Sequence, residues 1–256
     1  MLSFASTLWL QGFENQSHSR SNRKSDMPDT AWIQLSKELH ESEYGGRVAV
    51  YTDGSVKDGR AACAVYSDEF KQLSQLRDRT SIFTAELKAI LYAIMFIKNC
   101  PGKYIIYSDS TSSIIALQSV STSTHQVMYK IYEVFMNMPD GKVKIEWVPS
   151  YTGIPGNDKA DHVAGEALNL HDSQENSCTT EDAIRELRDI IRGEWNRDYS
   201  HGNFKLLKFR AEIGKLASSL LTRRQEVSIN RLRLEASMLS HGHIFSKTIP
   251  PKCTVC

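Results

Sequence analysis

Four carboxylates in this chain occupy positions where the surrounding residues are apolar, or where the surrounding sequence is typical of a helix. Two of them end apolar runs that are typical of buried strands, and two lie in stretches typical of helices. In chain order they are Asp53, Glu86, Asp109 and Asp161. Carboxylates are rarely buried unless they are paired or bind a metal ion. The four side chains are therefore predicted to share one cation site.

A site built from carboxylates, without histidine or cysteine, is typical of Mg²⁺, for which Mn²⁺ can substitute. Two such ions held together can activate a water molecule and stabilise the leaving oxygen in phosphodiester hydrolysis. Four like charges in one cleft repel each other unless cations neutralise them. The pattern predicts a metal-dependent nuclease whose site is loosely held without metal.

The elements that would position these residues follow from hydrophobic spacing. Strands are expected at 47–52, 61–67, 70–76, 103–108 and 143–148, and helices at 81–99, 110–119, 124–138 and 157–168. Hairpins followed by helix–strand alternation favour a mixed sheet with helices packed on it. Because a helical crossover connects the first and fourth strands, they can lie side by side in parallel. This would bring Asp53 and Asp109 together at the carboxyl ends of neighbouring strands.

Three of the four acidic positions, and the neighbouring Asp158, also have a simpler explanation. Asp53 precedes Gly54 and could begin a turn. Glu86 could be a solvated helix residue. Asp158 and Asp161 could be first-turn acids, which the helix dipole favours. The motifs of the chain, taken together, favour the shared cation site.

Four motifs resemble those of the ribonuclease H family and follow that family's order. They are Tyr51-Thr52-Asp53-Gly54-Ser55, Thr84-Ala85-Glu86, Tyr107-Ser108-Asp109-Ser110, and Trp147-Val148-Pro149-Ser150 followed by Gly156-Asn157-Asp158-Lys159-Ala160-Asp161. The resemblance is in particular to the ribonuclease H domains of non-LTR retrotransposon polyproteins. It implies an α/β fold, a ribonuclease H-like five-stranded mixed sheet flanked by helices, and hydrolysis of the RNA strand of RNA–DNA hybrids.

The resemblance also implies roles for individual residues. The catalytic, metal-binding tetrad would be Asp53, Glu86, Asp109 and Asp161, and the substrate-binding residues would be Gly54, Ser55 and Ser110. The implied cofactor is Mg²⁺, with Mn²⁺ as a substitute, and no small-molecule cofactor is expected. The implied partner is an RNA–DNA hybrid, and the implied origin is a retroelement. The sequence does not indicate an oligomeric state.

One position departs from the family's pattern. The family usually carries a histidine in the loop after Ser150, and Tyr151 stands there. An imidazole with a pKa of about 6.5 exchanges protons at neutral pH, whereas a phenol with a pKa of about 10 rarely does. Two hypotheses follow: an active nuclease, which the intact tetrad favours, and a catalytically weak or silent nucleic-acid-binding protein with the same fold, which Tyr151 favours.

The resemblance, which covers residues 46–169, and the composition of the remaining segments divide the chain into four expected parts. They are an N-terminal lead-in at 1–45 that is partly disordered, a ribonuclease H-like domain at 46–169, a linker at 170–182 and a basic helical extension at 183–256. The extension holds 14 Lys and Arg against 7 Asp and Glu, which suits a polyanion. Thr180 is expected to cap its first helix.

The chain's last residues, from Pro250 to Cys256, resemble the opening half of a zinc-knuckle-like motif. Cys253 and Cys256 alone cannot complete a tetrahedral zinc site, so Zn²⁺ would need a further ligand such as His241 or His243.

Five cysteines in 256 residues do not form a disulfide framework and favour a reducing, intracellular compartment. The nucleus or cytoplasm is expected, and Arg20, Arg23 and Lys24 leave organelle targeting open. The first ten residues lack a basic leader and are too short to span a bilayer, so neither a secretory signal nor membrane insertion is expected.

Overall fold

The computed structural model describes residues 28–119, 125–170, 176–202 and 222–233, together with Gly242. Two compact units, which are separated between Ile184 and Arg185, make up the chain. The strands of the first unit are β1 (Val48–Lys57), β2 (Arg60–Tyr66), β3 (Lys71–Leu76), β4 (Tyr104–Ser108) and β5 (Val143–Trp147). Its helices include α3 (Asp29–Glu43), α4 (Ile82–Lys98), α5 (Thr111–Gln118), α6 (Gln126–Met136) and α7 (Pro155–Ala167).

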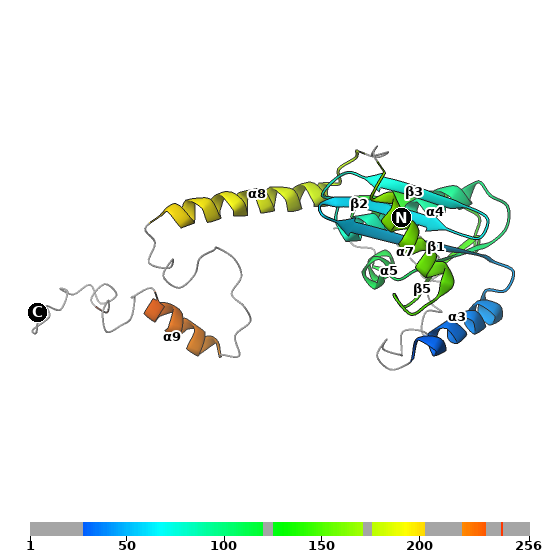
Figure 1. Cartoon of the computed structure of the whole chain (residues 1–256), viewed down its shortest axis with the longest axis horizontal. Helices are drawn as coiled ribbons and strands as arrows, with labels where there is room; N and C mark the ends of the chain where they lie inside the picture. Colours follow the sequence, from blue (N-terminus) through cyan, green and yellow to red (C-terminus); the bar gives the residue numbers. More distant parts are fainter. Residues whose placement is uncertain (1–27, 120–124, 171–175, 203–221, 234–241, 243–256) are drawn as a thin grey trace, which may run out of the picture. The chain divides into compact units, whose positions relative to one another are not determined.

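The five strands form one mixed sheet with the spatial order β3-β2-β1-β4-β5 (Figure 1). β1 and β2 pair antiparallel, as do β2 and β3. β1 and β4 pair in parallel, and so do β4 and β5. The predicted five-stranded mixed sheet, with its parallel first and fourth strands, is confirmed.

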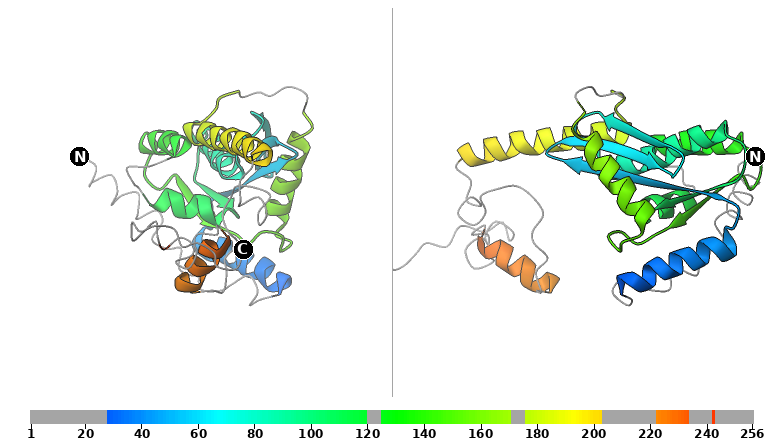
Figure 2. Two further views of the ribbon diagram at one scale, coloured as in Figure 1. Left: turned by 90° about the vertical axis from the view of Figure 1, so that its left-hand side faces the viewer. Right: turned by 45° about the vertical axis from the view of Figure 1, so that its right-hand side comes forward.

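Helices cover both faces of this sheet (Figure 2). On one face α4, α5 and α6 pack over the main core, which Val50 and Ile106 enter from the central strands. On the other face α7 packs over β2 and β3, and α3 packs over Ile105 and Tyr107 of β4. Because both faces of the central strands are covered, these strands are near-continuous apolar runs in the sequence.

β1 is longer than the strand expected from the sequence. It continues to Lys57, so Asp53 lies within the strand and not at its end. Parallel pairing with β4 stops at Thr52, whereas antiparallel pairing with β2 continues along the rest of β1. The chain turns only at Asp58 and Gly59, whose φ angles of 51° and 82° suit an Asp-Gly hairpin turn. Asp53 therefore does not begin a turn.

The N-terminal segment, predicted as part of the lead-in at 1–45, contributes a helix to the first unit. Trp32 of α3 is 2% exposed, and its ring meets the ring of Trp147 edge-on with 6.1 Å between centroids. The hydroxyl of Tyr44, just after α3, donates a hydrogen bond of 2.7 Å to Glu146 Oε2. Through these contacts α3 and the residue that follows it pack against β5.

Helix α8 (Thr180–His201) begins in the first unit, and α9 (Arg223–Arg233) belongs to the second. The cap of α8 is Thr179 and not the predicted Thr180, because the Thr179 hydroxyl accepts a hydrogen bond of 3.2 Å from the Asp182 N–H.

The residues considered for zinc lie outside the described part of the chain; they are Cys253, Cys256, His241 and His243. No described helix combines the length and apolar character needed to cross a membrane.

Trp32→Ala is expected to destabilise the first unit by about 3–5 kcal/mol, because it removes a buried indole and leaves a cavity. Equilibrium urea unfolding followed by far-UV circular dichroism measures the loss. Trp195→Ala is the matched control, since Trp195 is 59% exposed, and its effect should stay within about 0.5 kcal/mol. Equal losses in the two variants would contradict the packing of α3.

Candidate metal centre

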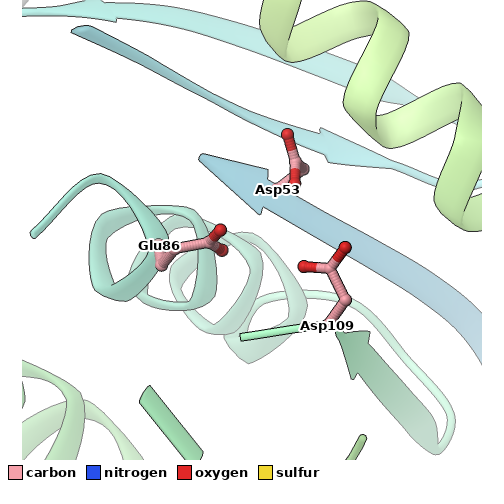
Figure 3. A group of neighbouring side chains, drawn as sticks. All are labelled: Asp53, Glu86 and Asp109. Atoms are coloured by element: carbon pink, nitrogen blue, oxygen red, sulfur yellow. The ribbon is translucent and has the colours of Figure 1, made fainter. Parts of the chain in front are cut away.

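Three of the four predicted carboxylates converge where β1 continues past the end of β4 (Figure 3). Asp53 comes from β1, Glu86 from the first turns of α4, and Asp109 directly follows β4. Each offers a carboxylate oxygen, and the three oxygens lie within 4.8 Å of one another. The sheet and one helix thus assemble an acidic cluster from segments far apart in the sequence.

A close approach between β1 and α4 sets the spacing of this cluster. Gly54 lies against the first turn of α4, where an added Cβ would be 2.7 Å from the Glu86 nitrogen and 2.9 Å from the Ala85 carbonyl carbon. Both neighbours are backbone atoms, which cannot rotate away as a side chain can. Any side chain at position 54 would therefore push α4, and with it Glu86, away from Asp53.

Burial and mutual repulsion raise the pKa values of these carboxyls. The pKa of Asp53 rises to about 8, first because of burial and then because of the charges of Asp109 and Asp161. Burial, followed by the charges of Asp53 and Asp109, also raises the pKa of Glu86 well above its ordinary value. A hydrogen bond from the Gly54 N–H opposes both pKa shifts without cancelling them. The cluster therefore favours added positive charge, from protons or from cations.

The cluster fits a hard divalent cation. Asp53 Oδ2 and Glu86 Oε2 are buried and have no hydrogen-bond partner among the residues that the structure describes. Buried acceptors without a partner destabilise a fold, and a bound cation would satisfy both. Carboxylate oxygens without nitrogen or sulfur ligands suit Mg²⁺ or Mn²⁺.

Two side chains hold Asp109 in place. Its backbone carbonyl accepts a hydrogen bond of 3.2 Å from Trp147 Nε1, and its Oδ2 accepts one of 3.3 Å from Asn157 Nδ2. Asn157 is 2% exposed and lies four residues before Asp161 on α7, so the two share a face of that helix. Asn157 belongs to the motif that contains Asp161, but nothing in the sequence around it predicts this role.

Asp161 lies at the edge of the site. It is exposed, and it is not part of the group whose oxygens lie within 4.8 Å. Its charge nevertheless contributes to the raised pKa values of Asp53 and Glu86. Together with Ser55, Asp161 lines a groove of about 830 Å³ between the β1–β2 hairpin and α7. The fourth predicted carboxylate thus lines the groove, and its charge acts on the cluster.

The other predicted site residues have different surroundings. Ser55 is half-buried and lines the groove. Ser110 caps α5, because its hydroxyl accepts from the Ser113 N–H at 3.4 Å and donates to Ser113 Oγ at 2.8 Å. Tyr151 is 72% exposed and has a φ of 53°. The charge of Asp161, ahead of burial, raises the pKa of the Tyr151 phenol, so this group stays protonated at neutral pH.

Metal-free protein is expected to lose stability as the pH rises. The pKa of Asp53 is about 8 in the folded state, against an ordinary value of 3.8. Because the folded state binds this proton more tightly than the unfolded state, protonation of Asp53 stabilises the fold fully below about pH 4. This stabilisation is lost as the pH rises toward 8. Asp53→Asn should remove this loss and raise the unfolding temperature at pH 8. Thermal unfolding in EDTA from about pH 5 to 9 measures it.

Asp158→Asn is the control for this measurement, because Asp158 is exposed in the first turn of α7. It should retain the wild-type pH profile. Superimposable profiles for the wild type and both variants would contradict the buried acidic cluster.

Comparison with known protein families matches residues 45–169 to the family described as RNase H. The matched range contains the five strands, helices α4 to α7 and all four predicted carboxylates. Helix α3 precedes the match, and α8 follows it. The sheet topology, the acidic cluster and this match together support assignment of residues 45–169 to the ribonuclease H family.

Proposed function

We propose that this protein is a metal-dependent endonuclease that hydrolyses the RNA strand of RNA–DNA hybrids. The observation that carries the proposal is the convergence of Asp53, Glu86 and Asp109 in a fold of the ribonuclease H type. Asp161 completes the proposed tetrad from the edge of the groove. Nucleic-acid backbones are anionic, so an acidic cluster would repel them unless it bound cations. This repulsion supports chemistry that requires a metal.

Mg²⁺ or Mn²⁺, held by the four carboxylates, would polarise the scissile phosphate and help to deprotonate the attacking water. The protein's own contribution is to hold the ligand oxygens in place beforehand. Gly54 permits the short separation of β1 and α4. Asn157 orients the carboxylate of Asp109, and Trp147 holds its backbone. Fixed ligands reduce the reorganisation that the reaction requires.

The RNA–DNA hybrid is the proposed substrate because of the match to the RNase H family. A hybrid differs from duplex DNA in its wider minor groove and in the 2′-hydroxyl groups of one strand. Gly54 and Ser55 are proposed to contact the substrate next to Asp161, in the groove that Ser55 lines. Ser110 is less suited to this role, since its hydroxyl already caps α5.

We also propose that the chain derives from, or is part of, a retroelement and acts in the nucleus or cytoplasm. The motif resemblance supports the first point. Cysteine usage supports the second, since Cys100 and Cys178 are free thiols in the described part of the chain. The positive charge of residues 183–256 supports a role for the extension in contacting phosphates.

A second candidate function is nucleic-acid binding with weak or no catalysis. Tyr151 supports it, because its phenol stays protonated beside Asp161 and cannot exchange protons as the family's usual histidine does. The two candidates differ in turnover and not in fold.

Asp109→Asn is expected to lower hybrid cleavage by at least about 100-fold, since loss of even a supporting contact in a metal site typically costs 10- to 100-fold. A labelled RNA–DNA hybrid with saturating Mg²⁺ measures the rate, and duplex DNA of the same sequence should resist cleavage. Asp158→Asn carries the same change outside the cluster and should cleave normally. Cleavage by Asp109→Asn at the wild-type rate would refute the tetrad, and equal cleavage of duplex DNA would refute hybrid specificity.

Tyr151→His is expected to raise turnover on the hybrid by roughly tenfold, with the largest gain between about pH 6 and 7.5, because an imidazole exchanges protons there. Affinity for the hybrid should change little. Tyr129→His is the control, since Tyr129 is 54% exposed on α6. If the wild type is inactive and Tyr151→His brings no gain, the non-catalytic candidate is preferred.

A further inference from the structure

The segment that follows the family match is attached to the helix that carries Glu86. Residues 176–184 belong to the first unit, although the match ends at 169. Thr179 and Asp182 are 4% and 3% exposed. A segment expected to be a linker thus buries polar side chains at the start of α8.

The carboxylate of Asp182 binds the N-terminus of α4. Its Oδ1 accepts a hydrogen bond of 3.0 Å from the Ser81 N–H, and its Oδ2 accepts one of 3.0 Å from Thr179 Oγ1. The hydroxyls of Ser81 and Thr84 also donate to it. Burial raises the pKa of Asp182, but these hydrogen bonds outweigh burial and hold its pKa below the usual range. The anion is further stabilised because it lies at the positive end of the α4 dipole.

Glu181 makes a second attachment, to the N-terminus of α6. Its Oε1 accepts a hydrogen bond of 3.3 Å from the Gln126 N–H, and its Oε2 lies 3.7 Å from His125 Nε2. His125 Nε2 lies 3.2 Å from Thr84 Oγ1, within hydrogen-bond distance. The start of α8 therefore connects the N-termini of α4 and α6. We name Thr179, Glu181 and Asp182 the clasp.

The clasp holds the part of α4 that positions a carboxylate of the acidic cluster. Glu86 follows Thr84 by two residues, in the turn that Gly54 contacts. A shift of this turn would move the Glu86 carboxylate relative to Asp53. We propose that Asp182 is a positioning residue, which fixes the first turn of α4 and thereby the place of Glu86 in the metal site. Its effect on cleavage rests on the proposed function, whereas its effect on metal binding does not.

The test is Asp182→Asn in the full-length chain, which keeps the shape of the side chain and removes its charge. The expected results are a fall of about 3–6 °C in the unfolding temperature, and Mn²⁺ binding weakened by about tenfold in calorimetry. The kcat for a hybrid should fall while KM changes little. Asp189→Asn is the matched control on α8, because the Asp189 side chain is 56% exposed, and it should match the wild type.

Thr179 supplies a second pair of variants in case Asp182→Asn does not fold. Thr179→Val removes the hydroxyl that donates to Asp182 and caps α8, whereas Thr179→Ser retains it. Thr179→Val should reproduce the loss of Mn²⁺ affinity, whereas Thr179→Ser should bind Mn²⁺ as the wild type does. A merely structural contact would lower the unfolding temperature in both Asp182→Asn and Thr179→Val without changing Mn²⁺ binding.

Two outcomes would overturn the proposal. The first is normal Mn²⁺ affinity in a folded Asp182→Asn protein. The second is a gain in hybrid affinity or cleavage, because the Asp182 carboxylate would then be excluding a phosphate from the N-terminus of α4. If the wild type cleaves no hybrid, the Mn²⁺ titrations still decide the role of Asp182. Failure of the proposed nuclease function can therefore be distinguished from failure of the proposed role of Asp182.

Discussion

Repulsion among buried carboxylates is the constraint on which the rest of this structure depends. Asp53, Glu86 and Asp109 present oxygens within 4.8 Å of one another in a largely buried place. Two of these residues have strongly raised pKa values, and Asp53 reaches about 8. Such an arrangement disfavours the metal-free folded state. The surrounding packing holds each carboxylate in place. A bound cation would offset the repulsion between the carboxylates by attracting all of them.

Each ligand of the cluster is held by a different part of the fold. The absence of a side chain at Gly54 lets α4 approach β1 closely. Asn157 and Trp147 hold Asp109 from α7 and β5. Segments outside the family match add to this support, because α3 packs on Trp147 and the clasp binds the start of α4. The contacts that position the site thus come from several elements of the first unit.

The sheet and the acidic residues could be predicted because their signals are local. Apolar runs and turn residues mark each strand, and the carboxylates stand beside them. The end of β1 could not be predicted, since the polar residues after Thr52 look like a turn until α4 covers them. Asn157 and Asp182 were missed because their roles depend on distant partners; Asp182 and Ser81 are 101 residues apart in the sequence. Helix α3 did carry a signal, the spacing of Trp32 and Leu39, which composition obscured.

The most direct test of the central claim is the number of protons released when metal binds. Metal-free protein is titrated with Mn²⁺ at about pH 7 in buffers of different ionisation enthalpy. Because the pKa of Asp53 is about 8, the cluster holds protons that a cation must displace. We expect saturable binding with proton release that declines as the pH rises above 8, and loss of both in Glu86→Gln. Binding without proton release, or unchanged binding in Glu86→Gln, would contradict the account.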